Sequence, residues 1–483
     1  MTTTPETEQP GGEGVLAGLD SQVTTSFYWY LAVLSCIGGF LFGYDTADIG
    51  SVLDFIPYHL SSFQTGYLVA GASIGAAVGA LAAGPLTDRF GRKSLLIVDA
   101  AIYALGAILS AVAVNTAILL IARTLIGLAV GADSAIATAY IAEFAPKNRR
   151  GALMIMQQWM ITVGILVSYV VAVIIFKVAP GSATGADWRL ILGLGAVPAL
   201  VALGLRTRMP ESPRWLMLHE RYADTQKALS SLGMEVTEDE VRDTAEQLSE
   251  KERQLEQKTL WTPGVKRALW VVCAFFAFQQ ITGINIPFYY GPQILGGYLQ
   301  SGKSAVDGAV AGVEAAMILG AVNVVATFFA FRYIDKIGRK KLAIGGFAGM
   351  AVFILVAAWA VHFMAKGTPQ VWVIMVGFSF FISSFAIGVG GTGWLIQGEV
   401  FPTAVRGRAA ATCASVDWLA NFVIVQWFPT LKDNWGLAWV MVLFAVLAVL
   451  AIGFVARFLP ETKGLPLEEV TAVFEKRAKE SPI

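Results

Sequence analysis

The sequence carries the stretch Gly84-Pro-Leu-Thr-Asp-Arg-Phe-Gly-Arg-Lys93 and repeats its core as Asp335-Lys-Ile-Gly-Arg-Lys340, with 247 residues from Asp88 to Asp335. Two further motifs recur in the same order. Glu143-Phe-Ala-Pro146 returns as Glu399-Val-Phe-Pro402 after 256 residues, and Pro210-Glu211 returns as Pro460-Glu461 after 250 residues. Three motifs in one order at nearly one interval indicate a chain built from two similar halves.

The composition is that of a membrane protein. Of the 483 residues, 56% are hydrophobic and only 14% are charged, against about 25% in soluble domains. Lys plus Arg number 35 and Asp plus Glu number 35, so the basic excess that nucleic-acid binding needs is missing. The three cysteines (Cys36, Cys273 and Cys413) and the three histidines are scattered, without the spacing of a disulfide framework or a metal site. We therefore expect no enzyme, no metal and no cofactor.

Apolar runs of about 20 residues are long enough to cross a bilayer as helices, and they recur along the chain. They lie at roughly 28–53, 65–87, 94–113, 116–145, 153–178, 188–206, 265–299, 307–332, 341–365, 370–398, 406–431 and 435–458. The pattern predicts an all-α membrane protein with twelve transmembrane helices in two pseudo-symmetric six-helix bundles, 28–206 and 265–458. Residues 1–27 and 459–483 are predicted to be tails, and the charged insert 207–264 to form short amphipathic helices.

Basic residues mark one side of the predicted bundle. Arg and Lys gather in the loops after the second, fourth, eighth and tenth spans, whereas the opposite loops hold single lysines. Loops rich in Lys and Arg stay in the cytoplasm. We therefore expect a multi-pass protein of the cell membrane, with both termini and the 207–264 insert on the cytoplasmic side.

The repeated motifs carry a family resemblance. The 84–93 and 335–340 loops resemble the signature of the major facilitator superfamily, and Pro210-Glu-Ser-Pro-Arg214, Gln279-Gln-Ile-Thr-Gly-Ile-Asn285 and Pro460-Glu-Thr-Lys-Gly464 resemble its sugar porter branch. The resemblance runs from about Gly38 to Gly464. It implies a secondary transporter that imports a monosaccharide or polyol by proton symport, with its site between the halves near the bilayer midplane. The expected partners are the solute, protons and lipid, and we expect a monomer.

Ionisable residues inside the spans are candidates for proton coupling because a charge at the bilayer centre is costly. Asp45 resembles the carboxylate that proton-coupled sugar porters carry in the first span, and Arg123 matches the arginine that pairs with it. A carboxylate in low dielectric favours its neutral form, whereas a nearby guanidinium favours the charged form. A helix rearrangement that changes this balance links protonation to conformation.

Amides and aromatic rings are the expected solute ligands. Amides both donate and accept hydrogen bonds, as sugar hydroxyls do. Gly283 and Pro287 break the seventh span and predict a gating hinge near Tyr289 and Tyr290. With the resemblance, the predicted solute-binding residues are Gln158, Gln279, Gln280, Asn285, Asn323, Trp394, Asp417, Trp418 and Asn421.

Acids recur beside the basic loops. Acids contribute little to membrane topology, so their recurrence indicates a charge network that latches the halves together when the outside is open. Its predicted members are Asp88, Arg89, Arg92, Glu143, Arg150, Glu211, Asp335, Arg339, Glu399, Arg406 and Glu461.

Two departures from the family pattern leave alternatives open. Gly390-Gly-Thr-Gly393 stands before Trp394 where many sugar porters have a proline-rich turn, so a bend is expected there without the rigidity of proline. Asp48, Asp133 and Asp417 are extra acids, which favour a polyol, an amino sugar or another cationic or zwitterionic solute. A sugar sensor that does not transport is a further alternative.

Overall fold

The computed structural model of the chain describes residues 15, 26–144, 150–178, 183–256, 261–299, 304–401, 403–463 and 473–476. Its first half contains α2 Ser26–Val52, α3 Ser62–Phe90, α4 Arg92–Ala111, α5 Thr116–Phe144, α6 Arg150–Val178, α7 Trp188–Leu194 and α8 Ala196–Arg206. Three short helices follow, α9 Pro213–Leu218, α10 Tyr222–Ser231 and α11 Glu238–Glu256. The second half contains α12 Pro263–Ile281, α13 Ile286–Tyr289, α14 Gly291–Leu299, α15 Ala305–Ile337, α16 Arg339–Phe363, α17 Thr368–Phe385, α18 Gly391–Val400, α19 Thr403–Trp435 and α20 Leu437–Phe458.

The helices match the predicted spans. Within the described residues, eleven helical segments are long and apolar enough to cross a membrane, and α2 with 27 residues is a further helix of that length. The predicted ends at 206 and 458 coincide with the ends of α8 and α20. Helices α15 and α19, with 33 residues each, run past the predicted apolar spans into the charged loops. Apolar length identifies the part of a helix inside the bilayer, not its polar ends.

Two spans are broken where the sequence predicts a bend. Between α12 and α13, Gly283 has φ +84°, and a Cβ atom there would lie 2.6 Å from the Phe444 ring, so only glycine fits. Pro287 follows inside the first turn of α13. Between α17 and α18, residues Ala386–Gly390 form a π-helical turn, a common cause of helix kinks.

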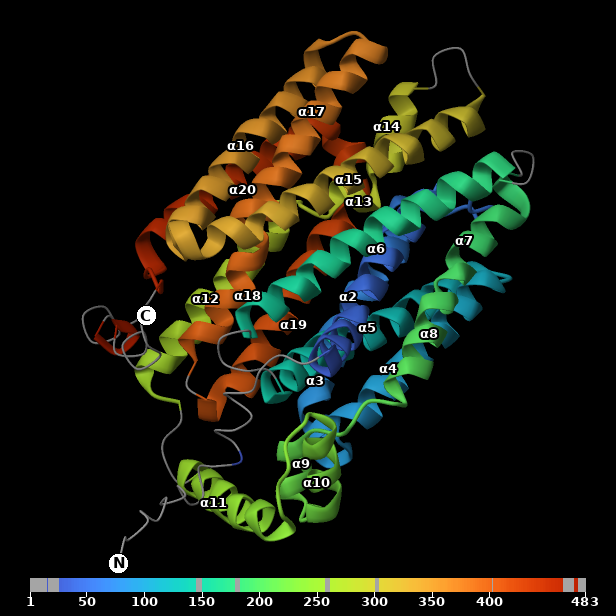
Figure 1. Cartoon of the computed structure of the whole chain (residues 1–483). Coiled ribbons are helices and arrows are strands. Elements are labelled where there is room, and N and C mark those ends of the chain that lie inside the picture. Colours follow the sequence, from blue (N-terminus) through green and yellow to red (C-terminus); the bar gives the residue numbers. More distant parts are fainter. Residues whose placement is uncertain are drawn as a thin grey trace, which may run out of the picture.

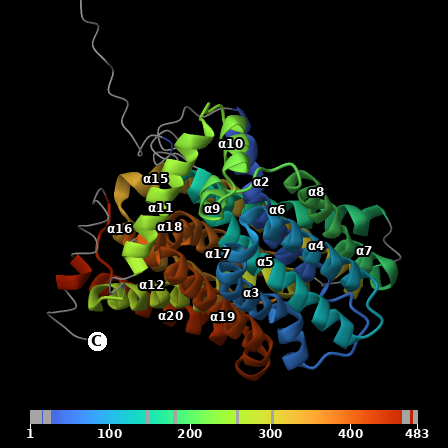
Figure 2. The same ribbon diagram turned by 90° about the horizontal axis from the view of Figure 1, so that it is seen from below.

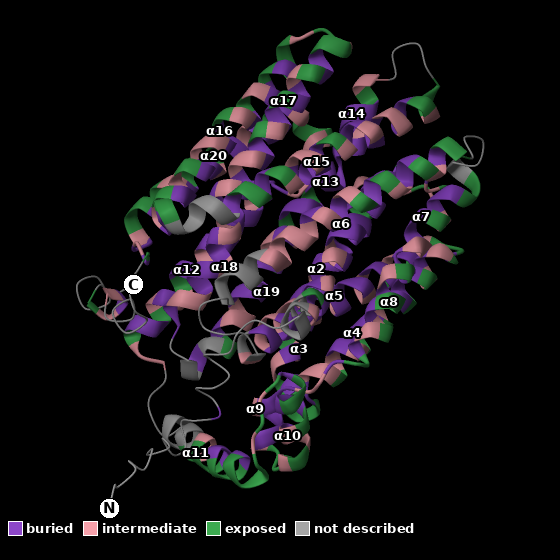
Figure 3. Cartoon of the chain, in the orientation of Figure 1, coloured by how far each residue is buried: buried purple, intermediate pink, exposed green. Residues whose placement is uncertain are grey.

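Small residues bring the helices of the first half into close contact. A Cβ atom on Gly75 of α3 would lie 2.2 Å from the Thr124 carbonyl of α5, and one on Gly127 of α5 would lie 1.9 Å from the Ala72 carbonyl of α3. Contacts of this kind between small residues hold helices together in a bilayer, where water supplies no hydrophobic driving force. The exposed residues in Figure 3 lie along the outward faces of the bundle, and large apolar side chains such as Leu105, Trp359 and Trp372 are among them.

The two halves lie side by side, and Figure 1 shows α9–α11 together at one end of the bundle. We call this end the linker face and the other end the opposite face. Figure 2 gives the arrangement of the helices turned by 90°, with α12, α19 and α20 on one side and α4, α7 and α8 on the other. The candidate site described next lies where helices of both halves meet.

Candidate functional site

A buried charge cluster joins α2 to α5. Arg123 of α5 forms an ion pair with Asp45 of α2 through Nη1 and Oδ1, and its Nε donates to the Leu68 carbonyl of α3 at 3.2 Å. Asp48, one turn from Asp45, places Oδ1 3.9 Å from the same Nη1. Asp45 and Arg123 are fully buried, and Asp48 is 3% exposed. The structure thus pairs the two predicted coupling residues and adds Asp48 to them.

A chain of hydrogen bonds connects four of the predicted solute-binding residues. Gln280 donates to Asp417 at 2.8 Å, and Asn285 donates to Gln280 and to Asn421, each at 2.9 Å. Asn421 in turn donates to Ser73 Oγ of α3 at 2.8 Å. Because α3 belongs to the first half and α12 and α19 to the second, this chain, which we call the amide chain, crosses the boundary between the halves.

The remaining predicted ligands lie outside the amide chain. Gln279 donates to the Gly390 carbonyl at 3.3 Å, and its Oε1 is buried without a partner among the described residues. Trp394 packs against Phe276, and Trp418 packs against Phe42 of α2 with ring centroids 4.8 Å apart. Gln158 is half-buried on α6, and Asn323 is buried on α15, where Thr327 donates to it at 3.4 Å.

The tyrosines predicted to gate the site are fully buried on and after α13. Tyr290 donates to the Val425 carbonyl of α19 at 3.0 Å. Tyr169 of α6 donates to the Phe288 carbonyl at 2.5 Å, and a Cβ atom on Gly50 of α2 would lie 2.6 Å from the same carbonyl. Helix α13 is therefore held against α2 and α6, helices of the other half.

Each of the three extra acids lies beside a polar or charged group of the protein. Asp48 lies beside Arg123, and Asp133 of α5 pairs with Arg206 of α8 at 2.5 Å. Asp417 accepts a hydrogen bond from the Gln280 amide at 2.8 Å. A neutral amide adds no positive charge, so the preference for a cationic or zwitterionic solute stays a prediction.

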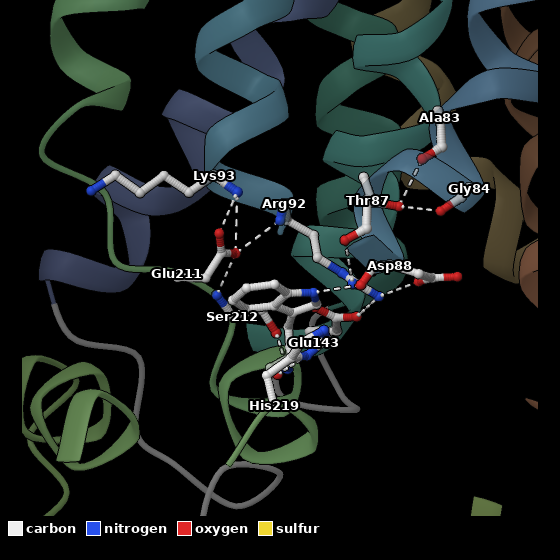
Figure 4. A network of polar contacts seen from close by, with 11 residues as sticks. Ala83, Gly84, Thr87, Asp88, Arg92, Lys93, Glu143, Glu211, Ser212 and His219 are labelled. Carbon is white, nitrogen blue, oxygen red and sulfur yellow. Dashed lines mark hydrogen bonds and ion pairs between the residues drawn. The ribbon is translucent and has the colours of Figure 1, made fainter. Parts of the chain in front are cut away.

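Carboxylates organise the linker face of the first half (Figure 4). Glu211 accepts hydrogen bonds from the backbone N–H groups of Arg92 and Lys93, at 2.9 and 3.1 Å, where α4 begins. A carboxylate at a helix N-terminus is favourable because the unpaired N–H groups point at it. The Arg92 side chain forms ion pairs with Glu143 at 3.1 Å and with Asp88 at 3.3 Å.

The second half repeats this arrangement. Glu461 accepts the backbone N–H of Arg339 at 2.8 Å, and the Arg339 guanidinium pairs with Glu399 at 2.6 Å. Arg89 lies exposed, with its guanidinium 5.2 Å from the Phe90 ring. The side chains of Arg150, Asp335 and Arg406 lie outside the described part of the chain. The described pairs each join residues of one half, so a latch between the halves stays a prediction.

Contacts between the halves gather at the opposite face. Ser62 at the start of α3 donates to Asp433 near the end of α19 at 2.5 Å, and Gln426 donates to the Phe63 carbonyl at 2.8 Å. Further contacts there join Gln293 to Asp54 and Lys177 to Glu314, both at 2.8 Å. These bonds close the opposite face of the boundary between the halves.

Sequence reasoning missed several residues that the structure places beside these groups. Ser73 ends the amide chain, and its hydroxyl gives no signal in an apolar span that already contains many small residues. Asp99 and Arg206 flank Asp133, and a signal for them was present, because a charged residue inside or at the edge of an apolar run needs a partner. Cys273 and Cys413, 140 residues apart in sequence, have sulfur atoms 3.6 Å apart.

Two similar bundles with broken helices and a polar chain between them are the architecture of a secondary transporter. The family model "Sugar (and other) transporter" matches residues 31–474, and the chain belongs to this family.

Relatives and solved structures agree with this assignment. The chain is 35% identical to the glucose transporter GlcP of Staphylococcus epidermidis over 93% of its own length and 98% of that protein. It is 34% identical to the arabinose-proton symporter of Bacillus subtilis over 92% and 96% of the two chains. The xylose transporter XylE of E. coli, solved in a partially occluded inward open conformation, superposes with TM-score 0.78 at 28% identity, covering 91% of this chain and 100% of XylE.

Proposed function

We propose that this protein imports a neutral monosaccharide or polyol into the cell by proton symport, with alternating access to a site between its halves. The observation that carries the proposal is the position of the Asp45–Arg123 pair. The pair lies on α2 and α5, and α2 contacts α13, the helix next to the amide chain. Helix α2 bears Asp45 and Asp48 and contacts α13 at Gly50, and α13 follows directly on Asn285. A change at the ion pair can therefore reach the hinge through one helix contact.

The ion pair supplies the coupling. When Asp45 is ionised, its charge and its hydrogen bond hold the Arg123 guanidinium toward α2. A proton on Asp45 removes that attraction and leaves Arg123 with Asp48 and the Leu68 carbonyl. Because the pair is buried, the attraction is stronger than it is at the protein surface, so its loss changes how firmly α2 and α5 are held together. Proton binding then favours a different packing of α2.

The amide chain supplies the solute ligands. Gln280, Asn285 and Asn421 hydrogen-bond to one another, and a sugar hydroxyl can replace each of these bonds because it both donates and accepts. The unpartnered Gln279 Oε1 and Trp418 Nε1 add one acceptor and one donor nearby. A solute that bridges these groups and Ser73 links the two halves, which couples binding to the motion between them.

The contacts at the opposite face define the direction of access. The positions of the basic loops support a cytoplasmic linker face. The hydrogen bonds Ser62–Asp433 and Gln426–Phe63 then close the extracellular side, which is the arrangement of an inward-facing carrier. The resemblance to XylE in its partially occluded inward open conformation supports this assignment. Import requires these bonds to break when the site faces outward.

The test is uptake by the purified protein in proteoliposomes, with glucose, arabinose and xylose as the solutes. We expect an imposed inward proton gradient to drive accumulation of at least one of them. Asp45→Asn should abolish accumulation and retain exchange of labelled for unlabelled sugar, because the neutral side chain mimics the protonated state. Asp224→Asn is the matched control, since Asp224 lies in the linker, away from the boundary between the halves, and is also hydrogen-bonded by an arginine, Arg221.

Three outcomes separate the proposal from its alternatives. Accumulation that persists in Asp45→Asn would show that this carboxylate does not couple transport to protons. Binding of a sugar without exchange in the wild-type protein would indicate a sensor. Transport restricted to amino sugars or other cations would overturn the proposal that the solute is neutral.

A further inference from the structure

A second cluster of buried charges lies in the first half, apart from the Asp45–Arg123 pair. Arg206, the last residue of α8, donates from Nη1 to Asp99 of α4 at 2.7 Å and from Nη2 to Asp133 of α5 at 2.5 Å. Its Nη1 also donates to the Leu96 carbonyl at 2.8 Å. Arg206 is fully buried, and the two aspartates are each 4% exposed. Three helices thus meet at one guanidinium.

The charges in this cluster do not balance. Arginine is not deprotonated in proteins, so the guanidinium contributes one positive charge. Two ionised carboxylates would leave one negative charge uncompensated in a buried site, at a cost of several kcal/mol. A buried group in this position takes up a proton instead of staying charged. Charge balance therefore requires one proton on Asp99 or Asp133.

The geometry leaves a place for that proton. Each aspartate uses one oxygen to accept from Arg206, and the other oxygens, Asp99 Oδ2 and Asp133 Oδ1, are buried without a partner among the described residues. Asp133 Oδ1 lies against α2, where a Cβ atom on Gly38 would be only 2.0 Å away. The titratable and charged groups facing the cluster are its own three side chains from α4, α5 and α8 and the Cys36 thiol of α2.

The position of the cluster relates it to the coupling pair. Gly38 precedes Asp45 by seven residues on α2, which is two turns or about 10 Å along the helix axis. Arg206 ends α8 on the side from which the chain continues to α9, so the cluster lies between Asp45 and the linker face. A shift of α2 that follows a change at Asp45 also changes what covers Asp133.

We propose that Asp99, Asp133 and Arg206 form a second proton-binding site, which holds one exchangeable proton shared by the two carboxyl groups. The proton leaves or enters as α2 moves relative to α5. Its place in the transport cycle rests on the proton symport proposed above, but its existence does not.

Infrared spectroscopy of the purified protein in lipid tests the site directly, because a protonated carboxyl group has a C=O stretching band that a carboxylate lacks. We expect the wild-type spectrum at about pH 7, well above the usual pKa of aspartate near 4, to contain this band. Asp99→Asn and Asp133→Asn should each remove the same band, since either substitution leaves one carboxylate to balance Arg206. The band should shift in heavy water as the proton exchanges.

The matched control is Asp224→Asn in the linker. Asp224 is also hydrogen-bonded by an arginine, Arg221, at 2.7 Å, but it is exposed, and that hydrogen bond lowers the pKa of Asp224. This substitution should leave the band unchanged. Asp45→Asn should leave in place the part of the band that Asp99→Asn and Asp133→Asn remove, because Asp45 and Asp48 share a different guanidinium, that of Arg123.

The two aspartates give independent readouts of one proton, so a variant that fails to fold leaves the other to decide. A spectrum in which neither substitution reduces the band would overturn the proposal, because both carboxylates would then be ionised. A band that does not shift in heavy water would show that the shared proton does not exchange and would contradict the proposal on that point. If the wild-type protein shows no proton-driven uptake, the proposed symport is refuted, and the infrared result is unaffected.

Discussion

A close glycine contact between α3 and α19 allows closure of the opposite face to be tested. A Cβ atom added to Gly66 of α3 would lie 2.1 Å from the Gln426 carbonyl of α19, whereas ordinary contact begins at 3.4 Å. Both atoms belong to or adjoin the backbone, so no side chain can rotate away. We therefore expect Gly66→Ala to push the two helices apart by about 1.3 Å, the difference between these distances.

The separation breaks the hydrogen bonds on either side of the contact. Gln426 donates to the Phe63 carbonyl at 2.8 Å, and Ser62 donates to Asp433 at 2.5 Å. Each such bond contributes about 0.5–1.5 kcal/mol. Loss of both shifts the equilibrium toward the state that is open at the opposite face by about 1–3 kcal/mol, or about 5- to 150-fold.

Cross-linking measures this shift through a contact that the substitution does not touch. Cysteines in place of Asp54 and Gln293, whose side chains meet at 2.8 Å across the halves, should cross-link with a short bifunctional reagent when the opposite face is closed. We expect the rate to fall severalfold in Gly66→Ala and to stay unchanged in Gly204→Ala, because a Cβ atom on Gly204 meets nothing within 4 Å. Equal rates in the two variants would refute the closure described here.

Two further predictions concern the amide chain. Asn285→Ala removes the donor to Gln280 and should weaken sugar binding by about 1–3 kcal/mol, the usual effect of unpairing a buried polar group. An unchanged affinity in calorimetry would move the site away from the break between α12 and α13. Asp417→Gln keeps an acceptor for the Gln280 amide and removes the charge. Uptake of neutral sugars should therefore survive, with a selectivity altered in competition assays. Complete loss of uptake would contradict the role given to Asp417.

The fold could be predicted from the sequence because its signals are local. Apolar length predicts each span, and Gly283 with Pro287 predicts the break between α12 and α13 from their backbone properties alone. The pair Asp45–Arg123 was predicted from the family resemblance, which supplies a contact between distant residues that periodicity cannot.

The partners of the other buried charges could not be predicted in the same way. Asp133 is predicted to be an unusual acid, but its partner Arg206 ends a helix 73 residues away. Only the packing of α5 and of α8 against α4 brings the two side chains together. The same holds for Cys273 and Cys413, whose proximity depends on α12 lying against α19. Which side chains meet depends on the rotation of each helix about its axis, and an apolar run leaves that rotation undetermined.

The central claim is that sugar and proton move together, and a pH electrode measures this most directly. When glucose, arabinose or xylose is added to proteoliposomes in a weakly buffered medium, we expect the medium to become alkaline as protons enter with the sugar. Asp45→Asn should take up sugar by facilitated diffusion without this change. Uptake of labelled sugar by the wild-type protein with no alkalinisation of the medium would contradict the account.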